Sequence, residues 1–275
     1  MMKRNLFYLT VFVLIGIAFT SCKKDDPVLS VPEFVSATLS DDNQEIVIVF
    51  DQAVYSAANM TGILDANNFV VTVTGGTLTG MTYSALHTEG SDEVTMTLVL
   101  EGKISGDEVI TITPVNIYSV DGGMMDATDE VSVTLVDLGI VGEWYSSGDN
   151  VAALLVTYFN VDSIYADFKI NYTYVVESYD IDGVKTEYSG TYVQTKSNVG
   201  DIWTIEIIQS APAAGGSEGI FEIYTGVPEY DMKYEVVQTE PDIGNVPPTP
   251  AEGFGSSNGG TLGTINIQKY YRLSY

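Results

Sequence analysis

The chain has 275 residues, with 37 Asp or Glu against 11 Lys or Arg, and its formal net charge at pH 7 is −26. A field of this sign repels nucleic acid and anionic lipid headgroups, which leaves cations and neutral molecules such as glycans as partners. The single cysteine excludes a disulfide within the chain. Stability must therefore come from apolar burial, for which this length suffices in one or two domains.

The first 21 residues have the layout of an export signal. Lys3 and Arg4 precede an uncharged run, 6–19 (LFYLTVFVLIGIAF), and two small residues then lead to Cys22. The run is too short to span a bilayer, since a spanning helix needs roughly 20 apolar residues. It fits the apolar part of a secretory signal peptide, so we expect residues 1–21 to be removed. Removal takes away Lys3 and Arg4 and no acid, which changes the net charge from −26 to −28.

The positive start, the apolar run and the cysteine that closes it resemble the signal of a bacterial lipoprotein. Phe19 departs from the aliphatic residue that is usual three positions before that cysteine. The resemblance implies that Cys22 begins the mature chain and carries acyl chains, each buried CH2 contributing about 0.8 kcal/mol to membrane binding. It also implies an outer-membrane location, with the membrane as a partner through this lipid. Secretion with a free thiol is the alternative.

A short charged tract follows the cysteine. Lys23, Lys24, Asp25 and Asp26 (KKDD) resemble the surface-export signals of lipoproteins from the Bacteroidetes group. The resemblance implies display at the cell surface, whereas a solvated tether is the alternative and leaves the orientation open. Residues 22–32 then form the anchor and an extended linker.

Residues 33–137 are predicted to form an immunoglobulin-like β-sandwich. Runs of β-branched and aromatic residues alternate with polar ones, and turn residues separate them. The seven strand candidates are 34–39, 45–50, 69–73, 77–86, 93–100, 108–114 and 130–136. Seven short strands of this kind are typical of such a sandwich. The order of the segments VPEFVSATLS, NNFVVTVTGG and EVITITP also resembles bacterial Ig-like domains of cell-surface proteins.

Residues 138–275 are predicted to form an antiparallel β-barrel. The eight strand candidates are 142–146, 152–159, 163–177, 184–195, 201–209, 219–224, 231–240 and 265–273. Eight strands suit a small closed barrel, which leaves no exposed edge. The G-x-W of VGEWYSSG and the closing QKYYRL resemble the lipocalin-like domains appended to Bacteroidetes lipoproteins. A second Ig-like sandwich is the alternative for this half.

One long segment, 239–264, is rich in Pro, Gly and Ser and does not read as strand. A loop of this length in a compact domain is usually either functional or mobile. We expect it to pack over one end of the barrel, with Phe254 between two glycines, and a binding lip is the sharper alternative.

Catalytic and metal-binding motifs are scarce. His87 is the only histidine, which excludes a His-pair zinc site, and we expect it to be a solvated loop residue. No nucleophile elbow occurs. Carboxylates are abundant, so a hydrolase with an acidic pair remains a rival class. No cofactor is predicted. Calcium at DIDG (180–183) or in the loop 121–130 is the alternative, although DIDG is more simply a hairpin turn.

Aromatic residues are the remaining candidates for binding. Tyr and Trp rings stack on sugars and add hydrogen bonds, but they also fill barrels. The ligand-binding candidates are Trp144, Tyr172, Trp203 and Phe254. Trp144 is expected at the floor of the barrel and Trp203 toward its interior, where a ligand or packed side chains would fill the space.

The sequence thus predicts an all-β, lipid-anchored envelope protein that is not an enzyme. The predicted role is a binding or adhesion module for a glycan, a protein or a small ligand, with the sandwich as a stalk. A hydrolase in the C-terminal half and a purely structural spacer are the alternatives.

Overall fold

The computed structural model describes residues 28–224 and 230–274. Cys22 and the tract Lys23 to Asp26 lie outside these residues, so the lipid anchor and the export signal stay predictions. No helix of the described ranges is long and apolar enough to cross a membrane.

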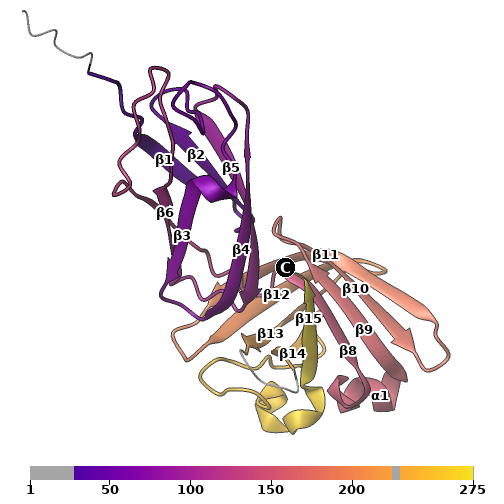
Figure 1. Ribbon diagram of the computed structural model, residues 1–275. Helices are drawn as coiled ribbons and strands as arrows, with labels where there is room; N and C mark the ends of the chain where they lie inside the picture. The colour runs from indigo at the N-terminus through magenta and orange to yellow at the C-terminus, as the bar shows by residue number, and fades with distance from the viewer. Residues whose placement is uncertain (1–27, 225–229, 275) are drawn as a thin grey trace, which may run out of the picture.

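The first part of the fold is a sandwich of two antiparallel sheets (Figure 1). One sheet has the order β1 (Phe34–Leu39), β2 (Glu45–Phe50), β5 (Glu93–Gly102) and β4 (Leu78–His87). The other has the order β3 (Phe69–Thr74), β6 (Val109–Pro114) and β7 (Val131–Thr134), and a 3-10 turn, η1 (Ala66–Asn68), precedes β3. This arrangement is that of a constant-type immunoglobulin domain, in which strands A, B, E and D face C, F and G.

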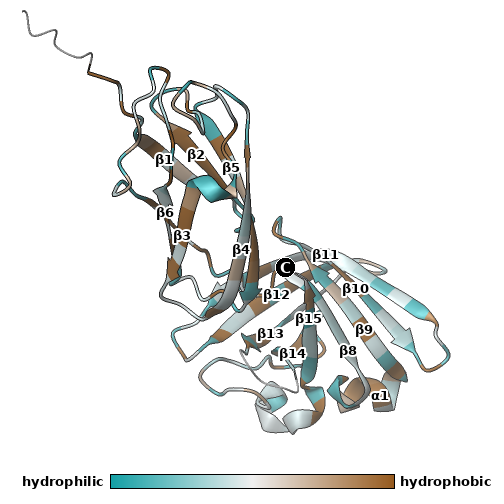
Figure 2. Cartoon of the chain, viewed as in Figure 1, coloured by the Kyte–Doolittle hydropathy of each residue, from teal (hydrophilic) through white to brown (hydrophobic). Residues whose placement is uncertain are grey.

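The sandwich core follows from strand alternation. In β2, Ile46, Ile48 and Phe50 are at most 1% exposed, whereas Val47 and Val49 on the opposite face are half-buried. Figure 2 shows how hydrophobic residues are concentrated in the strands of this domain. At about 25 cal/mol per Å² of apolar surface removed from water, such a core can hold a domain without a disulfide.

The second part is a closed barrel of eight antiparallel strands. The strands are β8 (Gly142–Ser147), β9 (Val161–Phe168), β10 (Thr173–Asp180), β11 (Lys185–Lys196), β12 (Ile202–Ala211), β13 (Gly215–Ile223), β14 (Met232–Glu240) and β15 (Gln268–Ser274). Consecutive strands pair, and β15 pairs with β8 to close the ring. The predicted all-β class, with a sandwich followed by a barrel, is confirmed.

Two strand predictions in the barrel are wrong. The predicted number of strands is still correct, because one predicted strand is a helix and another is two strands. The segment 152–159 is the helix α1 (Ala153–Phe159), and 163–177 is divided into β9 and β10 by a turn in which Tyr172 has φ +63°. Short apolar runs do not distinguish strand from helix by periodicity, and Ala and Leu favour helix once tertiary packing permits it. Val156, Tyr158 and Phe159 of α1 are exposed.

Aromatic side chains fill the barrel near the start of β8. Trp144 is 0% exposed, Phe168 and Tyr192 meet edge to face at 5.2 Å, and Trp203 stacks on Phe221 at 5.7 Å. A cavity of about 270 Å³ lies on the outer side, between β11 to β13 and the segment 247–250. The packed rings of Trp144, Phe168 and Tyr192 show that the interior at this end of the barrel is occupied by side chains.

The long loop lies against the outer wall of the barrel, and its last part also contacts α1 at the end of the barrel (Figure 1). It contains the 3-10 turns η3 (Ser257–Gly260) and η4 (Gly263–Asn266). The outward-facing carboxylate of Glu235 on β14 is fully buried beneath it and accepts hydrogen bonds from the N–H groups of Gly255 (2.6 Å) and Ser257 (3.2 Å).

Hydrogen bonds tie the segment between β7 and β8 to both domains. The side-chain amide of Asn43 donates to Val136 O at 2.8 Å and accepts from its N–H at 2.9 Å. On the barrel side, Gln194 accepts from Ile140 N–H and donates to Leu138 O. The connection is therefore held at each end.

Candidate functional site

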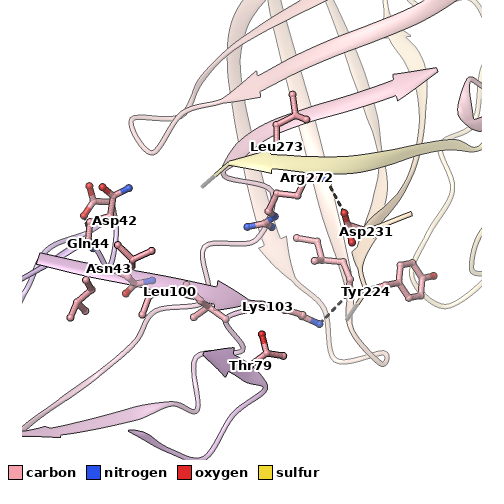
Figure 3. A pocket seen from close by; sticks show the side chains of 15 residues that line it. Asp42, Asn43, Gln44, Thr79, Leu100, Lys103, Tyr224, Asp231, Arg272 and Leu273 are labelled. Atoms are coloured by element: carbon pink, nitrogen blue, oxygen red, sulfur yellow. Dashed lines mark hydrogen bonds between the residues drawn. The ribbon is translucent and has the colours of Figure 1, made fainter. Parts of the chain in front are cut away.

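A cavity of about 580 Å³ lies between the two domains (Figure 3). Its size falls within the usual range for small-molecule sites, roughly 300 to 1,000 Å³. Both domains line it, so neither fold alone contains the site. Its lining residues are Asp42, Asn43, Gln44, Thr79, Leu98, Val99, Leu100, Gly102, Lys103, Ile104, Ile223, Tyr224, Asp231, Arg272 and Leu273.

The sandwich contributes an apolar wall and a polar rim. Leu98 and Ile104 belong to the sandwich core, and Val99 on the opposite face of β5 is 59% exposed. Lys103 crosses to the barrel, where its ammonium donates to Ile223 O at 3.0 Å and lies 3.7 Å from Asp201. This bond holds the apolar wall against the barrel.

The barrel contributes a cation that packs on an aromatic ring. The guanidinium of Arg272 lies 4.4 Å from the ring centroid of Trp144. The indole N–H of Trp144 donates to Ile140 O at 2.7 Å, which fixes the plane of the ring. The backbone N–H of Arg272 donates to the Asp231 carboxylate at 2.9 Å. Stacking on Trp is a favourable place for guanidinium because the ring face is electron-rich.

The charged groups around the cavity are of both signs. Arg272 and Lys103 come from opposite domains, and Asp231 and Asp42 border the same space (Figure 3). Tyr224 lies beside them, and burial together with its hydrogen bond to Glu222 raises the pKa of its phenol. An arrangement of this kind can orient a small ligand that has both polar and apolar parts.

None of the four aromatic residues proposed from the sequence lines this cavity. Trp144 is buried and acts on the cavity only through Arg272. Tyr172 is 58% exposed at the turn between β9 and β10. Trp203 faces the interior with Lys196 5.7 Å from its ring, and Phe254 lies outside the barrel with Lys233 5.2 Å from its ring. Their role in binding stays a prediction.

Sequence reasoning missed Arg272, although a signal for it was present. In β15, Gln268, Tyr270 and Arg272 alternate toward the interior, and the first two are buried. A cation in register with buried residues needs a partner such as an aromatic ring or a carboxylate. The residue pairing that brings Arg272 opposite Trp144 could not be read from either segment alone.

The prediction for His87 is wrong. It is the last residue of β4 and 5% exposed, and its Nδ1 accepts from Leu64 N–H at 3.0 Å. Its Nε2 lies 3.2 Å from Ser91 O. The ring thus bridges two loops as a structural residue, because a buried N–H requires an acceptor.

The acidic segments considered for calcium have other partners. Asp180 Oδ1 accepts from Asp182 N–H and Val184 N–H, which is the expected hairpin turn. Asp121 accepts from Ser30 and Ser119, and the Ser119 hydroxyl in particular lowers the pKa of Asp121 to about 2. Within residues 28–224 and 230–274, no group of three or more potential ligands could hold a metal ion.

One pair of carboxylates, Glu177 and Glu187, lies close enough to be considered as the acidic pair of a hydrolase. Glu177 and Glu187 bind the same ammonium of Lys185, at 2.8 and 3.0 Å. Hydrogen bonds from Lys185 and Tyr179 lower the pKa of Glu177. Glycoside hydrolysis needs one carboxyl that stays protonated, with a raised pKa, so the environment of this pair acts against that chemistry.

These features define a two-domain, all-β protein with a ligand-sized cavity at its domain junction. No family model matches the chain, and no curated protein matches it. Among solved structures, the N-terminal part of the bacterial S-layer protein SbsC is similar at 12% sequence identity and a TM-score of 0.31. The match covers 68% of this chain and 43% of that one, so the chain spans less than half of that structure. A likeness at this level carries no argument about function.

Proposed function

We propose that this chain is a non-catalytic binding protein of the bacterial envelope, tethered through a lipid on Cys22 and taking a small ligand in the cavity between its domains. The observation that carries the proposal is the cavity of about 580 Å³, which both domains line. A ligand there would lie with its apolar part against Leu98 and Leu100 and its polar groups toward Arg272 and Asp231.

The path of the chain supports a stalk role for the sandwich. The described residues begin at the end of the sandwich that is remote from the barrel (Figure 1). A tether at Cys22 would therefore hold the sandwich near the membrane and present the cavity and the barrel outward. The tether is tested with a Cys22→Ser variant, which should lose incorporation of a labelled fatty acid and leave the membrane fraction. Retention of both would contradict the anchor.

The cavity is tested by filling it. Val99→Trp adds bulk at an exposed lining residue without touching the core, and Val35→Trp, 62% exposed on β1, is the matched control. Ligand-observed NMR with a fragment set of aliphatic and aromatic carboxylates, amines and alcohols is the assay, on the full chain. Fragments that bind the parent and Val35→Trp should be lost with Val99→Trp. Binding that survives in Val99→Trp, or a parent that binds no fragment, refutes the cavity as the site.

A further inference from the structure

A continuous row of outward-facing side chains crosses five adjacent strands of the barrel. The row consists of Tyr271 on β15, Tyr145 on β8, Tyr165 on β9, Glu177 on β10 and Glu187 on β11. Each residue is the direct cross-strand partner of the next. We call it the tyrosine row. Figure 1 shows β15, β8, β9 and β10 side by side.

The row lies on the outside of the wall because its sequence neighbours face inward. Trp144, Ala166 and Tyr270 are buried in the barrel at 0%, 0% and 5% exposure, and successive residues of a strand point to opposite faces. Tyr145 and Tyr271 lie directly opposite one another and are each 38% exposed. Packing of the core therefore does not account for these two rings.

Carboxylates hold two of the rings along the sheet surface. The hydroxyl of Tyr165 bonds to Glu143, which sits two positions before the direct partner Tyr145 on the neighbouring strand. A diagonal contact of that reach requires the ring to lean over the surface. In the same way, Tyr179 donates to Glu177 Oε2 at 2.6 Å, two residues back along its own strand. Tyr165 and Tyr179 are both half-buried, so part of each side chain is accessible to solvent.

Two lysines beside the tyrosine row are paired with carboxylates. Lys185 binds Glu177 at 2.8 Å and Glu187 at 3.0 Å, and Lys169 lies 3.6 Å from Asp167. Lys185 and Lys169 are thus engaged with carboxylates, and Lys269, two residues before Tyr271 on β15, lies 5.1 Å from the ring of Tyr230. The net charge of −26 disfavours a polyanion. The carboxylates have their own cations, which reduces the attraction for a polycation.

We propose that the tyrosine row binds a neutral oligosaccharide that lies across β15, β8, β9, β10 and β11. Adjacent strands are about 4.8 Å apart, which is close to the length of one pyranose unit, so successive rings can meet successive sugars. Aromatic faces stack on the apolar faces of pyranoses, and the carboxylates of Glu177 and Glu187 can accept hydrogen bonds from sugar hydroxyls. The charge balance, the spacing of the strands and the acceptor chemistry favour the same uncharged, polyhydroxylated ligand.

This surface shares no residue with the domain-junction cavity. The inference is therefore independent of the small-ligand site proposed above, and the filled-cavity variant Val99→Trp is expected to bind oligosaccharide as the parent does.

The test is calorimetric titration of the full chain with four neutral probes: cellohexaose, xylohexaose, mannohexaose and maltohexaose. Polygalacturonate serves as the anionic comparison. At least one neutral hexaose should bind with a Kd below about 1 mM, and polygalacturonate should not bind. Absence of binding to all four neutral probes overturns the proposal, as does binding of the polyanion alone.

The row is then tested by removing one ring at a time. Tyr145→Thr and Tyr271→Thr keep a strand-forming residue and should each weaken binding about tenfold or more, as for a buried aromatic contact in an interface. Tyr158→Ala, 74% exposed on α1, is the aromatic control and should bind as the parent does. A Kd unchanged in both threonine variants refutes the site. Loss of binding in all three variants, the control Tyr158→Ala included, at unchanged melting temperature also refutes the site, because the effect is then not specific to the tyrosine row.

Discussion

The carboxylate of Glu108 is expected to be a main support of the sandwich. The residue is 0% exposed, and it accepts hydrogen bonds from the loop before β6 and from the turn before β4. Thr77 N–H and the Ser105 hydroxyl donate to Oε1 at 2.8 and 2.9 Å, Gly106 N–H donates to Oε2 at 3.0 Å, and Ser105 N–H lies 3.1 Å from both oxygens. The replacement Glu108→Gln preserves the shape and removes the charge and one acceptor.

The magnitude follows from these bonds. Glutamine leaves the Gly106 N–H opposite an amide NH2, and the remaining bonds lose the charge that strengthens them. A hydrogen bond to a charged group contributes about 1.5 to 3 kcal/mol, so we expect a loss of about 3 kcal/mol for Glu108→Gln. With a urea slope of about 1 to 3 kcal/mol per molar, the midpoint should fall by roughly 1 to 3 M. Glu93→Gln, at an exposed glutamate of β5, is the control.

The assay can separate the two domains. Trp144 and Trp203 are the two tryptophans of the chain, and both lie in the barrel. Tryptophan fluorescence therefore follows the barrel, while far-ultraviolet circular dichroism follows both domains. Glu108→Gln should shift the dichroism transition more than the fluorescence transition. Equal shifts in both signals, or no shift in either, would refute the argument that this carboxylate supports the sandwich.

The pH dependence gives a second check on the same residue. Burial alone would raise the pKa of Glu108, but hydrogen bonds from Thr77 and Ser105 outweigh it and lower the pKa. A carboxyl with a lowered folded-state pKa contributes stability that is present above its unfolded pKa and is lost as the pH falls through the folded value. The difference in midpoint between the parent and Glu108→Gln should therefore shrink below the ordinary pKa of glutamate.

Two further predictions concern buried contacts. His87→Ala leaves Leu64 N–H without its acceptor and should lower the free energy of unfolding in urea by about 1 to 3 kcal/mol. If His87 were a solvated surface residue, the replacement would change stability little. Burial and the hydrogen bond to Glu143 raise the pKa of Tyr165 to about 12. The raised pKa contributes stability that is present below the unfolded value near 10 and is lost as the pH rises through the folded value. Glu143→Gln should lower the Tyr165 pKa in an ultraviolet phenolate titration, and an unchanged titration curve would contradict the contact.

Much of the fold could be predicted because strand period and turn chemistry are local. Ile46, Ile48 and Phe50 read as one face of a strand, and they form a buried face. The helix α1 could not be predicted, since a run such as ALLVTYF has no strand or helix period that decides it. The burial of His87 also escaped prediction, because its acceptor role depends on a loop 23 residues away.

The candidate sites depended more strongly on tertiary structure. The segment VGEWYSSG indicated an inward Trp144, and Trp144 is buried, but its contact with Arg272 joins residues at opposite ends of the barrel sequence. The tyrosine row has the same origin, since Tyr271 meets Tyr145 only when β15 closes against β8. Register between such distant strands is set by the whole barrel and not by either segment.

The sequence by itself determined the all-β class, the division into two β domains and the alternation that places Trp144 inside, because side chains of a strand change faces at every residue. The tertiary structure alone decided which cation stacks on Trp144, that Tyr145 and Tyr271 stand in one line, and that two domains enclose a cavity of about 580 Å³. These features arise from pairings between residues more than a hundred positions apart, and local propensity does not specify such pairings.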